Sequence, residues 1–275
     1  VGQDPEIACM VVEWVMEKAT IPVITKLTPN VHSVVPTGRS VVKAGSNGLS
    51  LINTIQSVTG VDLDSFVPNP YVGGKSVFGG YCGPAVKPIA LKMLTTIAQD
   101  DLTSKVPISG IGGVSTWKDA VEFMLLGASN VQVCTAAMHH GFRIVEDMAE
   151  GLNNWMNEKG FKKLTDFIGK SVPTVTHWED LDINYHHVAQ INQEKCIHCG
   201  LCYIACEDTS HQSINLEKGM PYNTYTIKEE ECVGCNLCQL VCPVDNCITM
   251  EERRVAPEYI NWVEWQKRGL PLNDH

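Results

Sequence analysis

The chain has 275 residues, 44% of them hydrophobic, which is enough to bury one large core or two ordinary ones. A formal net charge of −10 argues against a nucleic-acid ligand, because phosphate binding needs clustered lysine and arginine. No secretory leader pattern and no run of eighteen apolar residues is present, and the cysteine usage indicates a reducing compartment, so we expect a cytoplasmic protein.

Helical and strand patterns alternate over the first 160 residues. Asp4 suits an N-cap and Pro5 a first helical position, which predicts a helix over 4–19. The Val-, Ile- and Thr-rich run at 21–28 predicts a strand buried on both faces. The remaining strands are predicted over 48–54, 106–111 and 130–135, and the remaining helices over 33–44, 87–99, 116–126 and 142–159. This alternation predicts βαβ units on a parallel sheet, and four such strands make half of a (β/α)8 barrel.

Polar and small residues gather at the carboxyl ends of these strands, where barrels carry their functional groups. Lys26 is either a cation over a cofactor or a lysine that snorkels at the rim. Asn53 and Thr54 either hydrogen-bond a planar heterocycle or cap the strand end. The glycines at 110, 112 and 113 either let backbone amides approach a phosphate or form a tight turn.

A Gly- and Pro-rich insertion follows the second predicted strand, over about 57–86. A connection of that length in a barrel is usually a lid or a binding loop. Residues 165–189 carry no metal-ligand spacing, and we expect them to link the barrel part to the C-terminal part of the chain.

Eight of the twelve cysteines form two copies of one spacing, which has three cysteines at intervals of three residues and a fourth four residues later. This is the two-cluster ferredoxin pattern, in which the fourth cysteine of each run ligates the other [4Fe-4S] cluster. The first cluster then takes Cys196, Cys199, Cys202 and Cys242, and the second takes Cys232, Cys235, Cys238 and Cys206. Zinc ribbons or a disulfide framework are the alternatives.

Two other residues in this region are open to two interpretations each. Cys247 is either a packed thiol or a substitute ligand. His198, inside the first cysteine run, either tunes a cluster by hydrogen bonding to sulfur or occupies an exposed loop position.

Several segments carry a resemblance to a known family: KLTPN (26–30), INT (52–54), GGYCGPAVKPIAL (79–91), PISGIGG (107–113), VQVCTA (131–136) and IVEDM (144–148). With the paired cysteine runs, they resemble the catalytic subunits of NAD-dependent dihydropyrimidine dehydrogenases, whose barrel is also similar to dihydroorotate dehydrogenases. The resemblance implies an FMN-binding half-barrel over 1–164, a linker over 165–189, a ferredoxin-type α+β domain over 190–252 and a tail over 253–275.

The resemblance also implies a role for each strand end. Lys26 would lie beside the flavin ring, and Asn53 and Thr54 would contact both flavin and pyrimidine. The ribityl phosphate would be held by Gly83, Ile111, Gly112, Gly113, Cys134 and Thr135.

The implied reaction is the reversible reduction of uracil or thymine at the 5,6 bond, with electrons relayed through the clusters from an NADH-oxidising partner subunit that carries FAD and iron–sulfur clusters. No G-x-G-x-x-G fingerprint is present, so NAD is expected to bind elsewhere. A dihydroorotate dehydrogenase-like enzyme and a non-catalytic electron-transfer module remain as alternatives.

One departure from the family pattern concerns the catalytic acid. The sequence starts at VGQDPE, which in the family follows the first four barrel strands and the loop with the catalytic cysteine. Cys9 falls on a predicted helix and Cys82 in the phosphate-side motif, so no catalytic acid is assigned. An open half-barrel exposes strand edges, and we expect it to form an oligomer, to be completed by another chain, or to fold poorly.

Overall fold

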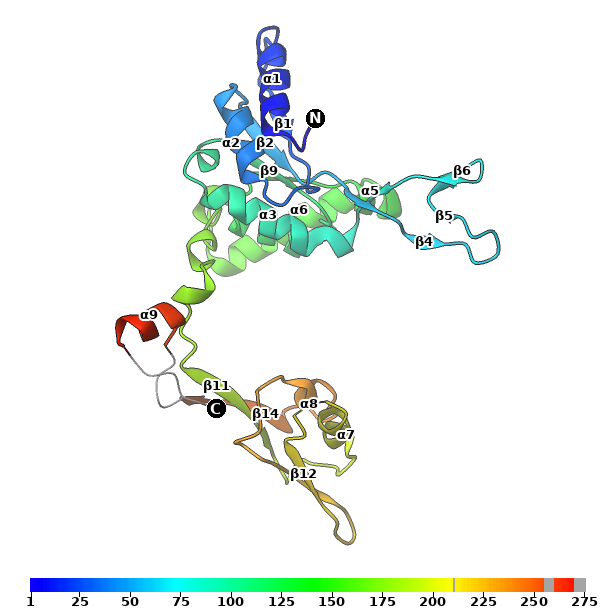
Figure 1. Ribbon diagram of the computed structural model, residues 1–275, viewed down its shortest axis with the longest axis vertical. Coiled ribbons are helices and arrows are strands. Elements are labelled where there is room, and N and C mark those ends of the chain that lie inside the picture. The colour runs from blue at the N-terminus through cyan, green and yellow to red at the C-terminus, as the bar shows by residue number, and fades with distance from the viewer. Residues whose placement is uncertain (210, 255–259, 270–275) are drawn as a thin grey trace. The chain divides into compact units, whose positions relative to one another are not determined.

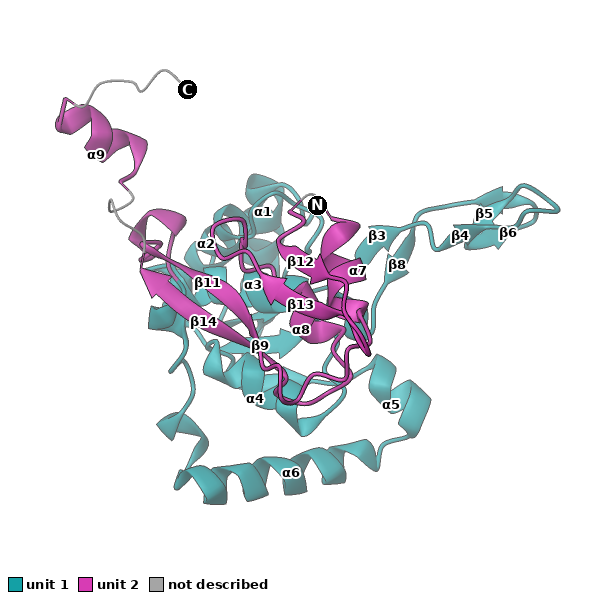
Figure 2. Cartoon of the chain, turned by 90° about the horizontal axis from the view of Figure 1, so that it is seen from below, with its two compact units in different colours: residues 1–175 teal, residues 176–275 magenta. Residues whose placement is uncertain are grey.

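The computed structural model describes residues 1–209, 211–254 and 260–269. The chain divides into two compact units, residues 1–175 and 176–275, which Figure 2 shows in teal and magenta.

The first unit is built around a four-stranded parallel sheet with the order β1-β2-β9-β10. The strands are β1 (Ile24–Lys26), β2 (Gly48–Leu51), β9 (Ile108–Ile111) and β10 (Asn130–Gln132). The helices are α1 (Pro5–Met16), α2 (Val35–Lys43), α3 (Lys87–Gln99), α4 (Trp117–Leu125), α5 (Thr135–His140) and α6 (Ile144–Lys159). The predicted parallel α/β half-barrel is therefore confirmed, and α3 has the predicted bounds.

Local sequence signals account for the helix ends. The side chain of Asp4 accepts hydrogen bonds from the amides of Glu6 and Ile7, and Pro5 occupies the first helical position of α1, as predicted. At the other end of the unit, α6 stops at Gly160, whose left-handed φ of 77° allows its amide to bond back to the last turn.

The register of the sheet separates an apolar face from a polar one. Leu49 pairs with Ile108 and Leu51 with Gly110, and this face packs against the helices in the hydrophobic core. Side chains alternate between the two faces of a sheet, so the residues between these positions share the opposite face. That face carries a polar row across all four strands, made of Lys26, Ser50, Ser109 and Asn130. In a barrel this polar side is the interior.

The expected burial of β1 on both faces is wrong. Ile24 is 55% exposed, and among the described residues β1 pairs with β2 alone. The strand lies at the edge of the sheet, where fewer neighbours cover it than cover β2, all four of whose residues are buried.

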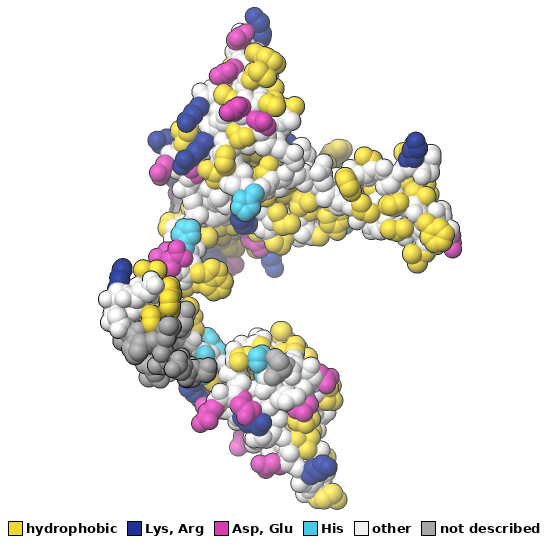
Figure 3. All heavy atoms as spheres, in the orientation of Figure 1, with side chains coloured by type: hydrophobic (Ala, Val, Ile, Leu, Met, Phe, Trp, Pro, Cys, Tyr) yellow, Lys and Arg dark blue, Asp and Glu magenta, His cyan; other side chains and the backbone are white. Residues whose placement is uncertain are grey.

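The insertion after β2 forms a long β arm that projects from the first unit (Figure 1). It consists of short antiparallel strands: β3 (Ile55–Ser57), β4 (Gly60–Val61), β5 (Pro68–Asn69), β6 (Tyr71–Val72), β7 (Lys75–Ser76) and β8 (Gly79–Tyr81). Apolar side chains crowd its surface in Figure 3, and Leu63, Phe66 and Phe78 are each more than 70% exposed. Its outer strands project away from the sheet, so only the base of the arm is placed to act as the predicted binding loop.

The described part of the second unit contains two antiparallel strand pairs and three short α-helices, of which α7 and α8 pack against each other. Its elements are β11 (Tyr185–Ile191), α7 (Leu201–Glu207), β12 (Ile214–Glu217), β13 (Thr224–Ile227), α8 (Leu237–Leu240), β14 (Ile248–Arg254) and α9 (Trp262–Lys267). β11 pairs with β14 and β12 with β13, which confirms the predicted α+β ferredoxin-like architecture.

Strand β11 is an element that the sequence analysis did not predict, since it begins inside the segment assigned to the linker. Residues 165–175 belong to the first unit and 176–189 to the second. The predicted tail, 253–275, includes residues 255–259 and 270–275, which lie outside the described residues. Across the described parts of the chain, no helix combines the length and apolar character that crossing a bilayer requires.

Candidate cofactor-binding sites

The carboxyl edge of the parallel sheet borders a cavity of about 120 Å³. Its lining includes every residue for which a flavin or pyrimidine contact is predicted: Lys26, Asn53, Thr54, Gly83, Ile111, Gly112, Gly113, Cys134 and Thr135. These residues come from segments as much as 109 positions apart, and the fold gathers them because parallel strands end at one edge.

Lys26 brings a cation to this cavity. Its side chain is exposed, and it makes no ion pair with any residue that the structure describes. The neighbouring Asn53 uses its side-chain oxygen locally, accepting a hydrogen bond from the amide of Thr54 at 2.8 Å. The strand-end cap considered from the sequence is therefore present, and Asn53 also lines the cavity.

The glycines on the opposite side of the cavity adopt conformations that other residues avoid. Gly83, Gly112 and Gly113 have φ values of 93°, 133° and 77°. Gly113 also approaches its neighbours closely, since a Cβ there would lie 2.8 Å from the Gly83 carbonyl oxygen. Gly110 does not line the cavity: a Cβ on this glycine would meet Phe123 and Leu94, so its role is packing.

Gln132 lines the cavity and was missed by sequence reasoning. Its side-chain nitrogen donates hydrogen bonds to the hydroxyls of Ser50 and Ser109, both at 2.8 Å, which fixes its amide across three strands. The available signal was a polar residue inside the apolar run NVQVCT, which a strand buried on both faces would not need.

Of the two thiols considered for a catalytic role, Cys82 lines the cavity, whereas Cys9 lies on α1. A further thiol of the lining, Cys134, is exposed like Cys82, and the Thr135 hydroxyl donates to the Cys82 sulfur at 3.2 Å. No contact of Cys82 or Cys134 supports a role for its thiol in proton transfer.

In the second unit, the eight predicted ligands separate into two groups, each around its own cavity. One cavity is lined by Cys196, Cys199, Cys202 and Cys242, the other by Cys206, Cys232, Cys235 and Cys238. These are the two sets that the crossed pattern predicts. All twelve cysteines are free thiols, so the structure contains no disulfide framework.

The two cysteine runs repeat one backbone conformation. His198 and Gly234 occupy the third position of each run and Gly200 and Asn236 the fifth, and all four have positive φ between 59° and 76°. These turns direct the first three cysteines of each run toward a common space. Among the described residues, no three His, Cys, Asp or Glu side chains are placed to hold a single metal ion.

Backbone amides donate hydrogen bonds to two of these sulfurs. The amide of His198 lies 3.4 Å from the Cys196 sulfur, and the amide of Ser213 lies 3.2 Å from that of Cys206. The hydrogen bond to sulfur considered for His198 thus comes from its backbone amide, while its ring stacks on Tyr222 and bonds to the Asn223 carbonyl oxygen.

The most buried thiols resist ionisation in the protein alone. Burial raises the pKa of Cys202 and of Cys238 to about 11. Iron must therefore displace a proton from each to form the thiolate bond. Cys247 is buried beside the first set, where burial also raises its pKa to about 11, and its sulfur lies 3.6 Å from the Asn192 carbonyl oxygen. Cys247 also lines the cavity of the first set, together with its four predicted ligands.

Comparison with protein families agrees with this division into two parts. Residues 1–156 match the family described as dihydroorotate dehydrogenase. The chain belongs to this family. Residues 189–250 match the family described as a 4Fe-4S dicluster domain, so this flavin-dependent oxidoreductase barrel is followed by a ferredoxin-type domain, as predicted.

Three relatives illustrate the similarity. The NAD-dependent dihydropyrimidine dehydrogenase subunit PreA of Escherichia coli (strain K12) is 42% identical over 214 residues, which cover 78% of this chain and 52% of the relative. The catalytic subunit of dihydroorotate dehydrogenase B (NAD(+)) of Pyrococcus furiosus is 43% identical over 171 residues, or 62% of this chain and 54% of the relative. The chloroplastic dihydropyrimidine dehydrogenase (NADP(+)) of Arabidopsis thaliana is 41% identical over 184 residues, or 66% of this chain and 43% of the relative. The chain thus spans about half the length of the relatives it matches.

Proposed function

We propose that this chain is the FMN- and iron–sulfur-binding part of a dihydropyrimidine dehydrogenase, which interconverts uracil or thymine and the 5,6-dihydropyrimidine. NADH oxidised by a partner subunit supplies the electrons. The observation that carries the proposal is that one chain combines a strand-end cavity, lined by a lysine and two glycine turns, with two cysteine-lined cavities.

The cavity fits one part of a flavin mononucleotide. Its volume of about 120 Å³ is below the roughly 300 Å³ of a typical ligand pocket, so the remainder of the molecule would extend over the open side. Backbone amides at the Gly83 and Gly112–Gly113 turns suit a phosphate, since no side chain shields them. The exposed ammonium of Lys26 suits a ring that gains negative charge.

The chain's own residues bind and orient, while its cofactors carry the electrons. A bound flavin supplies hydride transfer, and [4Fe-4S] clusters supply single-electron relay. Asn53 and Thr54 offer amide and hydroxyl groups to the edge of a pyrimidine, and Gln132, whose side-chain nitrogen is held by two serines, offers a further amide oxygen in the cavity lining. No residue of this chain is assigned as the catalytic acid.

The lengths of the matched segments support a pyrimidine over dihydroorotate as the substrate. The match to the E. coli dihydropyrimidine dehydrogenase subunit covers 214 residues, more than the 175 of the first unit, so it reaches into the cysteine-bearing unit. The match to the P. furiosus dihydroorotate dehydrogenase covers 171. Dihydroorotate remains the second candidate, because the barrel family bears that name.

Cofactor content is the first test. After anaerobic purification, we expect about one FMN and roughly eight irons per chain. Iron without flavin would leave an electron-transfer module and would remove the enzymatic proposal for this chain.

Substrate choice is tested by following flavin absorbance during anaerobic titration with uracil, thymine and orotate. Uracil or thymine is expected to perturb the spectrum, and a Lys26→Met variant is expected to bind flavin more weakly. A response to orotate alone would favour the dihydroorotate dehydrogenase alternative.

A further inference from the structure

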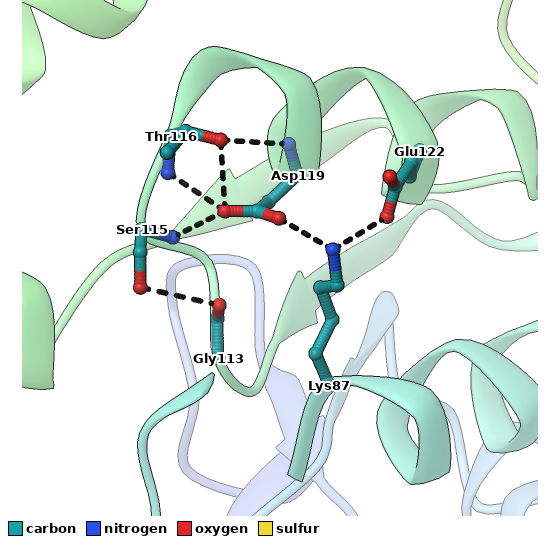
Figure 4. A network of polar contacts seen from close by, with 6 residues as sticks. All are labelled: Lys87, Gly113, Ser115, Thr116, Asp119 and Glu122. Atoms are coloured by element: carbon teal, nitrogen blue, oxygen red, sulfur yellow. Dashed lines mark hydrogen bonds and ion pairs between the residues drawn. The ribbon is translucent and has the colours of Figure 1, made fainter. Parts of the chain in front are cut away.

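One carboxylate holds the loop between β9 and α4 in place. Asp119, in the first turn of α4, accepts hydrogen bonds from the amides of Ser115 (2.9 Å) and Thr116 (2.8 Å) and from the Thr116 hydroxyl (3.0 Å), all through one oxygen. Figure 4 shows these bonds converging on that oxygen. The same residue completes a capping box with Thr116, which begins the helix.

The second oxygen of Asp119 connects this loop to the start of α3, which follows the neighbouring Gly83 turn. It lies 2.6 Å from the ammonium of Lys87, which is also 2.9 Å from a carboxylate oxygen of Glu122 (Figure 4). Lys87 is the first residue of α3 and follows the turn at Gly83. The two loops touch directly as well, because a Cβ on Gly113 would lie 2.9 Å from the Lys87 Cβ.

This arrangement leaves a defined set of amides without partners. Asp119 takes the amides of Ser115 and Thr116, whereas the amides of Gly112, Gly113 and Val114 find no acceptor among the described residues. All three lie in the wall of the cavity. Successive unpaired amides in such a turn form a concavity that binds anions.

The charges explain why the lysine itself is not the phosphate ligand. Lys87 is already held by two carboxylates, and the hydrogen bond to Asp119 is the main reason that its pKa is raised. Burial would raise the pKa of Asp119, but hydrogen bonds from Lys87, Ser115 and Thr116 outweigh it and hold that pKa below its usual value. The three groups form an ionised clamp with a net charge of −1, in which the ammonium of Lys87 offsets the charge of Asp119 on the side away from the loop amides.

We propose that Asp119 is a positioning residue that sets the Gly112–Val114 amides for a phosphate ester, and so makes the cavity select a phosphorylated flavin over riboflavin. This inference rests on the proposed flavin-binding function. Loss of the clamp lets the amides turn away from the phosphate, while contacts to the ring and the ribityl chain are unaffected.

A nearly identical constellation at the other end of α3 provides a matched control. Asp100 accepts from the amides of Leu102 and Thr103 and from the Thr103 hydroxyl, and it pairs with Arg39 at 2.6 Å. Asp100 follows the last residue of α3, whereas Lys87 is the first. Neither carboxylate lines the cavity, but only Asp119 accepts hydrogen bonds from the loop whose residues do.

The experiment titrates the flavin-free full chain with FMN and with riboflavin and follows quenching of flavin fluorescence. Asp119→Ala is expected to weaken FMN binding by about 10- to 100-fold, the equivalent of losing a hydrogen bond to a charged group, and riboflavin binding by less than about threefold. Asp119→Asn keeps an acceptor for the loop amides, so it should restore part of the FMN preference. Asp100→Ala should lower thermal stability and leave the FMN-to-riboflavin ratio unchanged.

The outcomes separate this inference from the proposed function. Equal weakening of FMN and riboflavin by Asp119→Ala would show a structural role only and would overturn the inference. An unmodified chain that binds neither flavin would overturn the proposed function, and the inference with it. Should Asp119→Ala fail to fold, Lys87→Met breaks the same clamp from its other side and gives the same readout.

Discussion

The buried cores of the two units differ in composition. The core of the first unit is hydrocarbon, with large members such as Phe123, Leu49 and Ile97 fully buried beneath the sheet and its helices. In the second unit, three of the seven buried core residues are cysteines, Cys202, Cys238 and Cys247, and further cysteines pack around them. We therefore expect the first unit to fold before it binds a cofactor, whereas the core of the second includes predicted cluster ligands.

The strongest test of this difference is removal of iron. We expect chelation to abolish hydrogen-exchange protection in residues 185–254, because the buried thiols lose the bonds that hold the small core together. The amides of β2 and β9 should stay protected, since their neighbours are apolar side chains. Equal loss of protection in both units would contradict the expectation that only the second unit needs iron to keep its core.

The crossed arrangement of ligands can be tested by combining substitutions. Cys206→Ser should remove about four of roughly eight irons, and so should Cys206→Ser with Cys235→Ser, because both residues line one cavity. Cys206→Ser with Cys199→Ser should remove nearly all iron, since Cys199 lines the other.

Cys247→Ser is the control for these variants, because Cys247 is packed and not expected to hold iron. Its iron content should match that of the unmodified chain. An uncrossed arrangement would reverse the results of the two double variants.

A smaller effect is expected from a methyl group in the first unit. Gly113→Ala places a Cβ 2.8 Å from the Gly83 carbonyl oxygen at a φ of 77°, and we expect it to cost about 3 kcal/mol and to abolish flavin binding. Gly141→Ala has a similar φ, 76°, but nothing within 4 Å, so about 1 kcal/mol and unchanged flavin affinity are expected. Urea unfolding and flavin titration measure both, and equal effects would contradict the close contact of the two loops.

The smallest predicted effect concerns a charge at the edge of the hydrocarbon core. Burial would raise the pKa of Asp100, but hydrogen bonds from Arg39, Thr103 and Leu102 lower it from 3.8 to about 2. Because the folded pKa is the lower one, this stabilisation is present above about pH 4 and is lost as the pH falls through about 2. Asp100→Asn should therefore lower the free energy of unfolding by about 2 kcal/mol at pH 7, with a smaller difference near pH 2. A loss that is independent of pH would point to packing instead of charge.

Much of this organisation could be predicted from residue spacing. The two cysteine runs predicted both thiol groups, including the exchange of Cys206 and Cys242, because the ligands are close in sequence. The strand ends predicted the cavity from the general geometry of parallel sheets. The N-cap at Asp4 and the bounds of α3 followed from local signals.

The remainder depends on contacts between distant residues. The exposure of β1 reflects its place at the sheet edge, and β11 is a strand because it pairs with β14, some 60 residues later. The Gln132 side chain is held by serines from two other strands, and the hydrogen bond between Lys87 and Asp119 joins residues 32 positions apart. No local pattern encodes such pairings.

The pairing of β11 with β14 has a consequence for how the cysteine-bearing unit can be moved between proteins. Tyr185 lies opposite Arg254, so the chain enters and leaves this segment at adjacent points. The two ends of the segment between these residues are therefore neighbours in space. A segment of this kind can be spliced into a surface loop of another protein, or removed from this one, without stretching the backbone on either side.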